Sequence, residues 1–158
     1  MKCVKKRLLC LLMVMVFVSG MLYSKTAMAK LKKGVYFSSL MGKNYSAENE
    51  LASIKRLSVR KNKLIVSGSF EYSKSKKEFY KSRKTKLRYK KRTFNLSKKW
   101  RVFGIGGEGR PTEYTRAGFI KTAKSYNGLG LMIIVDKKGK VKRLYLCSWK
   151  TKITLAYN

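Results

Sequence analysis

The sequence predicts a mainly β fold of the α+β class: a single antiparallel sheet or small open barrel of about six to eight strands, with one short helix near residues 115–126. Beyond residue 30, most segments alternate apolar and polar residues with the period of a strand. Short turn-like stretches separate these segments. Only one segment of the chain has apolar residues at helical spacing. Strands before and after a single helix favour a sheet that the helix covers.

The first predicted strands lie in the N-terminal half. A short strand over 35–38 is followed by a polar loop over 42–49. Segments 51–59 and 63–72 flank Arg60-Lys61-Asn62, which predicts a hairpin. The second segment alternates, with Leu64, Val66, Phe70 and Tyr72 on one face and Ile65, Ser67, Ser69 and Glu71 on the other.

The middle of the chain is richer in lysine. Residues 73–82 are expected to form a polar loop or a frayed helical turn, and strands are expected over 83–96 and 100–105 on either side of a Ser-Lys-Lys break. A glycine-rich loop is expected over 104–111.

The helix is predicted over 115–126. Its apolar residues form one stripe, and Asn127-Gly128 supplies the stop. The stripe consists of Ala117, Phe119, Ile120, Ala123 and Tyr126.

The strongest predicted hairpin joins 129–135 to 140–147. Its turn, Asp136-Lys137-Lys138-Gly139, suits a type I turn with the glycine in the left-handed position. Residues 131–135 are apolar on both faces, which predicts a central strand. A last strand is expected over 151–156.

The N-terminus predicts a secretory signal peptide. A positive segment with four cations within residues 2–7 precedes the apolar run 8–18, and Ala27 and Ala29 fit a cleavage site. Cleavage would leave residues 30–158 as one compact domain, secreted or associated with the cell wall. The short, lysine-rich signal peptide and the overall composition are typical of a bacterial protein.

Charge dominates the remaining chain. Residues 1–29 hold five of the 39 basic residues and none of the seven acidic ones, so residues 30–158 carry a formal charge of +27. Such a charge raises self-repulsion unless salt screens it or a polyanion neutralises it. Compositional bias toward lysine is the alternative explanation.

A row of cations is the most specific local pattern. In an extended strand, Lys84, Lys86, Arg88 and Lys90 would share one face at intervals of ~6–7 Å, which suits a repeating polyanion. The patch would be extended by Lys91, Arg92, Lys98, Lys99 and Arg101. Lysines that protect a sheet edge from aggregation are the competing explanation. Candidate stacking platforms for bases or sugars are Tyr72, Tyr80, Tyr89 and Trp100.

The segment 104–109 matches the G-x-G-x-x-G pattern, but Arg110-Pro111 interrupts the helix that dinucleotide binding needs, and no acid follows at the required distance. A loop in which Gly106, Gly107 and Arg110 bind an anion is the better interpretation.

The chain has few of the side chains that enzymes use for catalysis. The chain has no histidine, its only Asp is assigned to a turn, and no metal or cofactor is expected. Cys147 is the only cysteine beyond the predicted signal peptide and is expected to be buried on a strand, with an intermolecular disulfide as the alternative.

These features predict a secreted, non-enzymatic protein that docks on an anionic polymer of the cell envelope or medium, such as teichoic acid, an acidic glycan or nucleic acid. The first alternative is an interaction protein that meets an envelope protein through a sheet edge or Cys147. The second is a glycan hydrolase that uses two glutamates.

Overall fold

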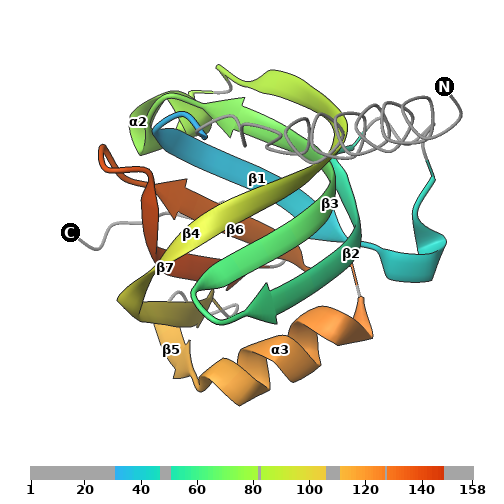
Figure 1. Ribbon diagram of the computed structural model, residues 1–158. Helices are drawn as coiled ribbons and strands as arrows, with labels where there is room; N and C mark the ends of the chain where they lie inside the picture. The colour runs from blue at the N-terminus through green and yellow to red at the C-terminus, as the bar shows by residue number, and fades with distance from the viewer. Residues whose placement is uncertain (1–30, 47–50, 82, 106–110, 127, 148–158) are drawn as a thin grey trace, which may run out of the picture.

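The computed structural model describes residues 31–46, 51–81, 83–105, 111–126 and 128–147. They form one mixed, mostly antiparallel sheet of seven strands with two short α-helices (Figure 1), which confirms the predicted mainly β class. The elements are β1 (Gly34–Leu40), the 3-10 helix η1 (Gly42–Asn44), β2 (Ser53–Arg60), β3 (Lys63–Ser73), α2 (Lys76–Tyr80), β4 (Thr85–Ile105), β5 (Pro111–Tyr114), α3 (Arg116–Ser125), β6 (Gly130–Val135) and β7 (Lys140–Cys147).

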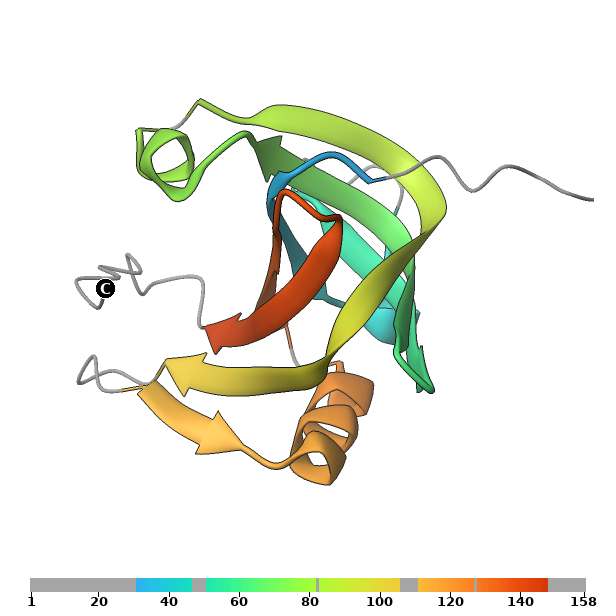
Figure 2. The ribbon, with the colours of Figure 1, turned by 60° about the vertical axis from the view of Figure 1, so that its left-hand side comes forward.

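Six strands curl into a near-closed ring, and β5 extends it as a hairpin partner of β4 (Figure 2). β1 and β2 pair with successive parts of β3, at Phe37↔Glu71 and then Ile54↔Gly68, so they act as two halves of one interrupted strand. The parallel pairing of β4 with β7 completes the ring. Because β6 returns to lie beside β1, the connections follow a Greek key.

The interior of the ring is apolar because β2, β3 and β4 turn alternate residues inward. The inward residues of β3 are the ones that alternation predicts, and Phe70 is fully buried. Phe70, Tyr36 and Phe94 form an aromatic triangle, with ring centroids 5.3–6.1 Å apart. Helix α3 adds Phe119 and Ala123 to the same core.

Helix α3 lies where the sequence predicts it. The Thr115 hydroxyl accepts a hydrogen bond from the Gly118 amide at 3.0 Å and caps the N-terminus. The helix ends at Tyr126, whose φ of 46° is left-handed. The amide of Leu57 donates to the Tyr126 hydroxyl at 3.0 Å, which ties this end of the helix to β2.

Loss of the cap should weaken α3. We expect Thr115→Ala to lower the free energy of unfolding by about 1 kcal/mol, because one amide of the first turn loses its acceptor. Thr115→Ser keeps an acceptor at this position and should cost less. Urea unfolding followed by circular dichroism measures both, and equal losses in the two variants would show that the hydroxyl does not act as a cap.

A second apolar cluster lies outside the ring. Val35, Phe37, Met132, Tyr145 and Cys147 on β1, β6 and β7 pack together with Phe79 of α2. β1, β6 and the C-terminal half of β7 are therefore buried on both faces, which confirms the central position predicted for 129–135. The predicted loop or frayed turn at 73–82 contains the short helix α2, capped by the Ser75 hydroxyl.

The β6–β7 turn forms as predicted. Gly139 has a φ of 73°, and one carboxylate oxygen of Asp136 accepts hydrogen bonds from the amides of Lys138 and Lys140, both at 2.9 Å.

Two predicted boundaries differ from the structure. β4 runs continuously from 85 to 105, because residues 97–100 form a bulge between the pairings Leu96↔Val141 and Arg101↔Arg143 and do not end the strand. The predicted loop is shorter, since Ile105 pairs with Pro111. The predicted signal peptide with Ala27 and Ala29, the loop residues Gly106, Gly107 and Arg110, and the strand over 151–156 lie outside the described residues. Among the described residues, no helix is long and apolar enough to cross a membrane.

Candidate polyanion-binding surface

The outer face of β2, β3 and β4 is polar and carries aligned cations. Arg60 pairs with Lys63, Lys63 with Asn95, and Asn95 with Lys140 of β7. The neighbouring residues Leu64, Phe94 and Val141 are fully buried, so this row points outward. It spans four strands, about 14 Å at the usual ~4.8 Å between strands.

A second row crosses the same face. Arg56 pairs with Ser67, and Ser67 pairs with Lys91. It lies four residues of β3 from the first row, about 13 Å along the strand. We define the basic face as the five exposed cations of both rows: Arg56, Arg60, Lys63, Lys91 and Lys140.

The described acids are engaged elsewhere. Glu71 lies 2.9 Å from Lys84, Glu78 accepts from the Lys74 amide, Glu113 pairs with Arg101, and Asp136 holds its turn. In the part of the chain that the structure describes, no ion pair joins an acid to the basic face. Of the four described acids, Asp136 alone contacts a residue of the basic face, through the backbone amide of Lys140 and not its ammonium group.

The predicted row of Lys84, Lys86, Arg88 and Lys90 is not regular. Lys84 precedes β4, and its ammonium lies between Glu71 and the ring of Phe79, 4.3 Å from the ring centroid. Gly68 pairs with Lys90 and Phe70 with Leu87, so a bulge interrupts the alternation between Arg88 and Lys90. All four side chains are exposed, but the prediction of one regular row is wrong.

Arg92 turns toward the interior and stabilises this bulge. Its guanidinium donates to the carbonyls of Gly68 and Arg88, both at 2.9 Å, and lies 5.5 Å from the centroid of the Phe70 ring. Burial lowers the pKa of the Arg92 guanidinium. Arg92 thus has a structural role that its place in a lysine-rich run does not indicate.

The predicted stacking residues divide into two groups. Trp100 is 3% exposed and packs edge-on against Phe119, so it belongs to the core. Tyr72 is partly buried against Tyr36, and its hydroxyl donates to the carbonyl of Lys33. Only Tyr80 and Tyr89 are exposed, and Tyr80 lies on α2 with its ring against Phe79, outside the basic face, so Tyr89 alone remains a candidate stacking residue of the four.

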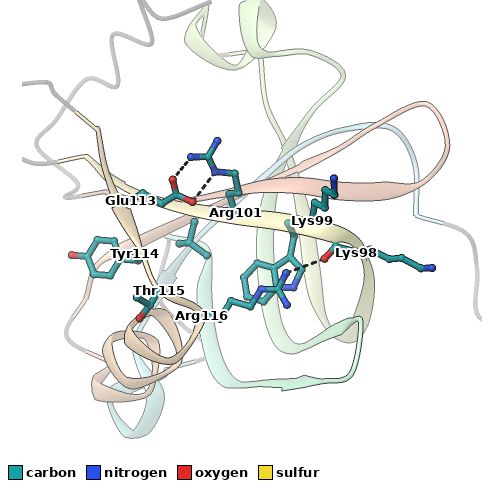
Figure 3. Close-up of a pocket in the computed structure, with 9 residues that line it drawn as sticks. Lys98, Lys99, Arg101, Glu113, Tyr114, Thr115 and Arg116 are labelled. Carbon is teal, nitrogen blue, oxygen red and sulfur yellow. Dashed lines mark hydrogen bonds and ion pairs between the residues drawn. The ribbon is translucent and has the colours of Figure 1, made fainter.

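The remaining predicted cations line a shallow pocket of about 390 Å³ between β4, β5 and the start of α3 (Figure 3). Lys98, Lys99 and Arg101 contribute from β4, and Arg116 from α3. Arg101 donates through two nitrogens to Glu113, an ion pair that raises the pKa of Arg101 and lowers that of Glu113. Arg116 lies 5.0 Å over the Trp100 ring and donates to the Lys98 carbonyl. Both arginines are thus held by the protein itself.

Cys147 is buried on β7, as predicted, with its thiol 3.6 Å from the Gly130 carbonyl. Burial raises the pKa of this thiol to about 12, so the thiolate forms only as the pH approaches that value. We expect Cys147 to resist iodoacetamide at pH 8 in the folded protein and to react fully in guanidinium chloride. Peptide mass spectrometry locates the label, and equal labelling in both states would contradict the burial.

No family model, curated protein or solved structure matches this chain in the three comparisons made. Within the described ranges, no group of His, Cys, Asp and Glu side chains forms a metal site. Sequence reasoning missed Arg56, Arg60, Lys63 and Lys140. The outward position of Lys63 follows from the alternation predicted for 63–72, whereas Arg60 belongs to the predicted turn and Arg56 lies beside a bulge of β2. The alignment of the cations depends on pairings between strands distant in the chain.

Proposed function

We propose that this protein is a secreted, non-enzymatic binding protein that docks its basic face on an anionic polymer. The observation that carries the proposal is the alignment of five exposed cations on one side of the ring, with no acid paired to them in the described part of the chain. Each anionic group that such a cation neutralises releases a condensed counterion, which favours binding to a polymer over binding to a single ion.

The architecture supports a ligand on this face. One class of five-stranded, partly open Greek-key barrel, the OB-fold, binds oligonucleotides and oligosaccharides on the face of its second and third strands. When β1 and β2 are counted as one interrupted strand, β3 and β4 are those strands here. The likeness is one of strand order, so the cations themselves carry the argument.

The structure also explains why this face stays open. The outer sides of β1, β6 and the C-terminal half of β7 are apolar and pack with α2, whereas the outer residues of β3 between Lys63 and Glu71 are Ile65, Ser67 and Ser69. Ser67 and Ser69 are short, so a polymer can approach β3 closely between the long cations.

Retention on heparin, nucleic-acid and teichoic-acid columns across a salt gradient tests the proposal. We expect retention on all three, with elution at several hundred millimolar salt, because five or more contacts make affinity fall steeply with ionic strength. Weak retention on every column would overturn the proposal and make the charge a solvated surface only. The interaction-protein alternative would then be tested by capture experiments at high salt.

A further inference from the structure

Two tyrosines from distant parts of the chain meet on the surface. Tyr45 follows η1 and Tyr89 lies in the bulge of β4, yet their ring centroids are 5.2 Å apart at an interplanar angle of 57°. The ammonium of Lys55 on β2 lies 5.7 Å from the centroid of the Tyr45 ring. Three separate segments therefore build one aromatic and cationic cluster. We call its two aromatic residues, Tyr45 and Tyr89, the tyrosine pair.

The tyrosine pair does not belong to either apolar core. The buried aromatic contacts of the described chain, such as Phe70 with Phe94, lie within the two clusters, and neither Tyr45 nor Tyr89 packs there. The Tyr89 side chain is 47% exposed. The Tyr89 ring thus offers π surface to solvent instead of filling the interior, and the half-buried Tyr45 ring packs against it.

The tyrosine pair is continuous with the basic face. Lys55 precedes Arg56 on β2, and Tyr89 lies two residues from Lys91 on β4. Arg88 and Lys90 flank Tyr89 and are exposed. A strand of polymer that crosses the basic face along β3 therefore leads toward the tyrosines, with cations on both sides.

We propose that the tyrosine pair stacks bases of a single-stranded nucleic acid whose phosphates contact the basic face. This inference rests on the proposed function and names its ligand. Every base has a planar π face that stacks on an aromatic ring whatever the sequence, whereas polyphosphate and teichoic-acid backbones have no such ring. Stacking of one base contributes about 5- to 140-fold in affinity.

Fluorescence anisotropy competition at one salt concentration compares the binding of four ligands. They are a dT oligonucleotide of about fifteen nucleotides, an abasic strand of the same length, polyphosphate and heparin. We expect the dT strand to bind at least about 5-fold more tightly than the abasic strand.

Tyr89→Leu and Tyr45→Leu should remove this preference and leave the affinity for polyphosphate within about twofold. Tyr89→Phe should retain the preference, because the ring stays. Tyr80→Leu, which changes an exposed tyrosine of α2, is the matched control and should retain it too. Unchanged circular dichroism and melting temperature show that the variants fold.

Equal binding of the dT and abasic strands by the unaltered protein would overturn the inference while leaving polyanion docking intact. An equal loss of heparin affinity in the two leucine variants would overturn it as well, because the tyrosines would then stack on sugar rings. Failure of all four ligands to bind would overturn the proposed function together with this inference.

Discussion

Replacement of Arg56, Arg60, Lys63, Lys91 and Lys140 by glutamine is expected to abolish most of the salt-dependent binding to polyanions. Each lost contact removes about 0.7 from the slope of log affinity against log salt for a single strand, so the five should reduce the slope by about 3 to 4. Fluorescence titrations at several salt concentrations measure this slope. The variant should fold normally, because all five side chains are exposed and none forms an ion pair with a described acid.

A matched control variant removes the same number of positive charges from a different part of the surface. Glutamine replaces five exposed lysines in or beside α2 and α3: Lys74, Lys77, Lys81, Lys121 and Lys124. Net charge falls equally in both variants, so only a localised binding surface makes their slopes differ. Equal slopes would mean that overall charge, and not the basic face, determines affinity.

The largest effect on stability is expected for Phe94→Ala. Phe94 is fully buried, and its ring lies 5.3 Å from Tyr36 and 5.7 Å from Phe70, measured between centroids. Truncation removes both contacts and leaves a cavity, which lowers the free energy of unfolding by about 3–5 kcal/mol. Small domains have only about 5–15 kcal/mol in total, so the urea midpoint should fall strongly.

Leu51→Ala provides the comparison for this change. Leu51 is 53% exposed, and its truncation should alter stability by less than about 0.5 kcal/mol. A Phe94→Ala protein that unfolds at the same urea concentration as the unaltered protein would contradict the placement of Phe94 in the aromatic triangle.

Much of the fold was predictable because local signals and tertiary packing agree. Alternation along β3 marked its buried face, and Asp136 with Gly139 marked the β6–β7 turn. The stripe ending at Tyr126 marked α3 within a residue at each end. In each case the residues that form the element also determine which side is buried.

The candidate surface was less predictable because it depends on register. Period-2 spacing places Lys84 to Lys90 in one row only if β4 is regular, and the bulge opposite Ser69 changes the direction of the side chains. Trp100 was expected to be a surface aromatic, but the residues that bulge before it allow its ring to pack against Phe119. The cross-strand rows and the meeting of Tyr45 with Tyr89 join residues far apart in the chain, and no single segment indicates them.

Protection of individual lysines from acetylation by a bound polyanion tests the central claim most directly. Brief treatment with acetic anhydride, with and without a single-stranded oligonucleotide or heparin, is followed by peptide mass spectrometry. The basic face predicts that Lys63, Lys91 and Lys140 are protected, while the exposed Lys77, Lys121 and Lys124 on the helices react equally in both samples. Uniform protection of all six lysines, or protection of the helical lysines alone, would contradict a binding surface on β2, β3 and β4.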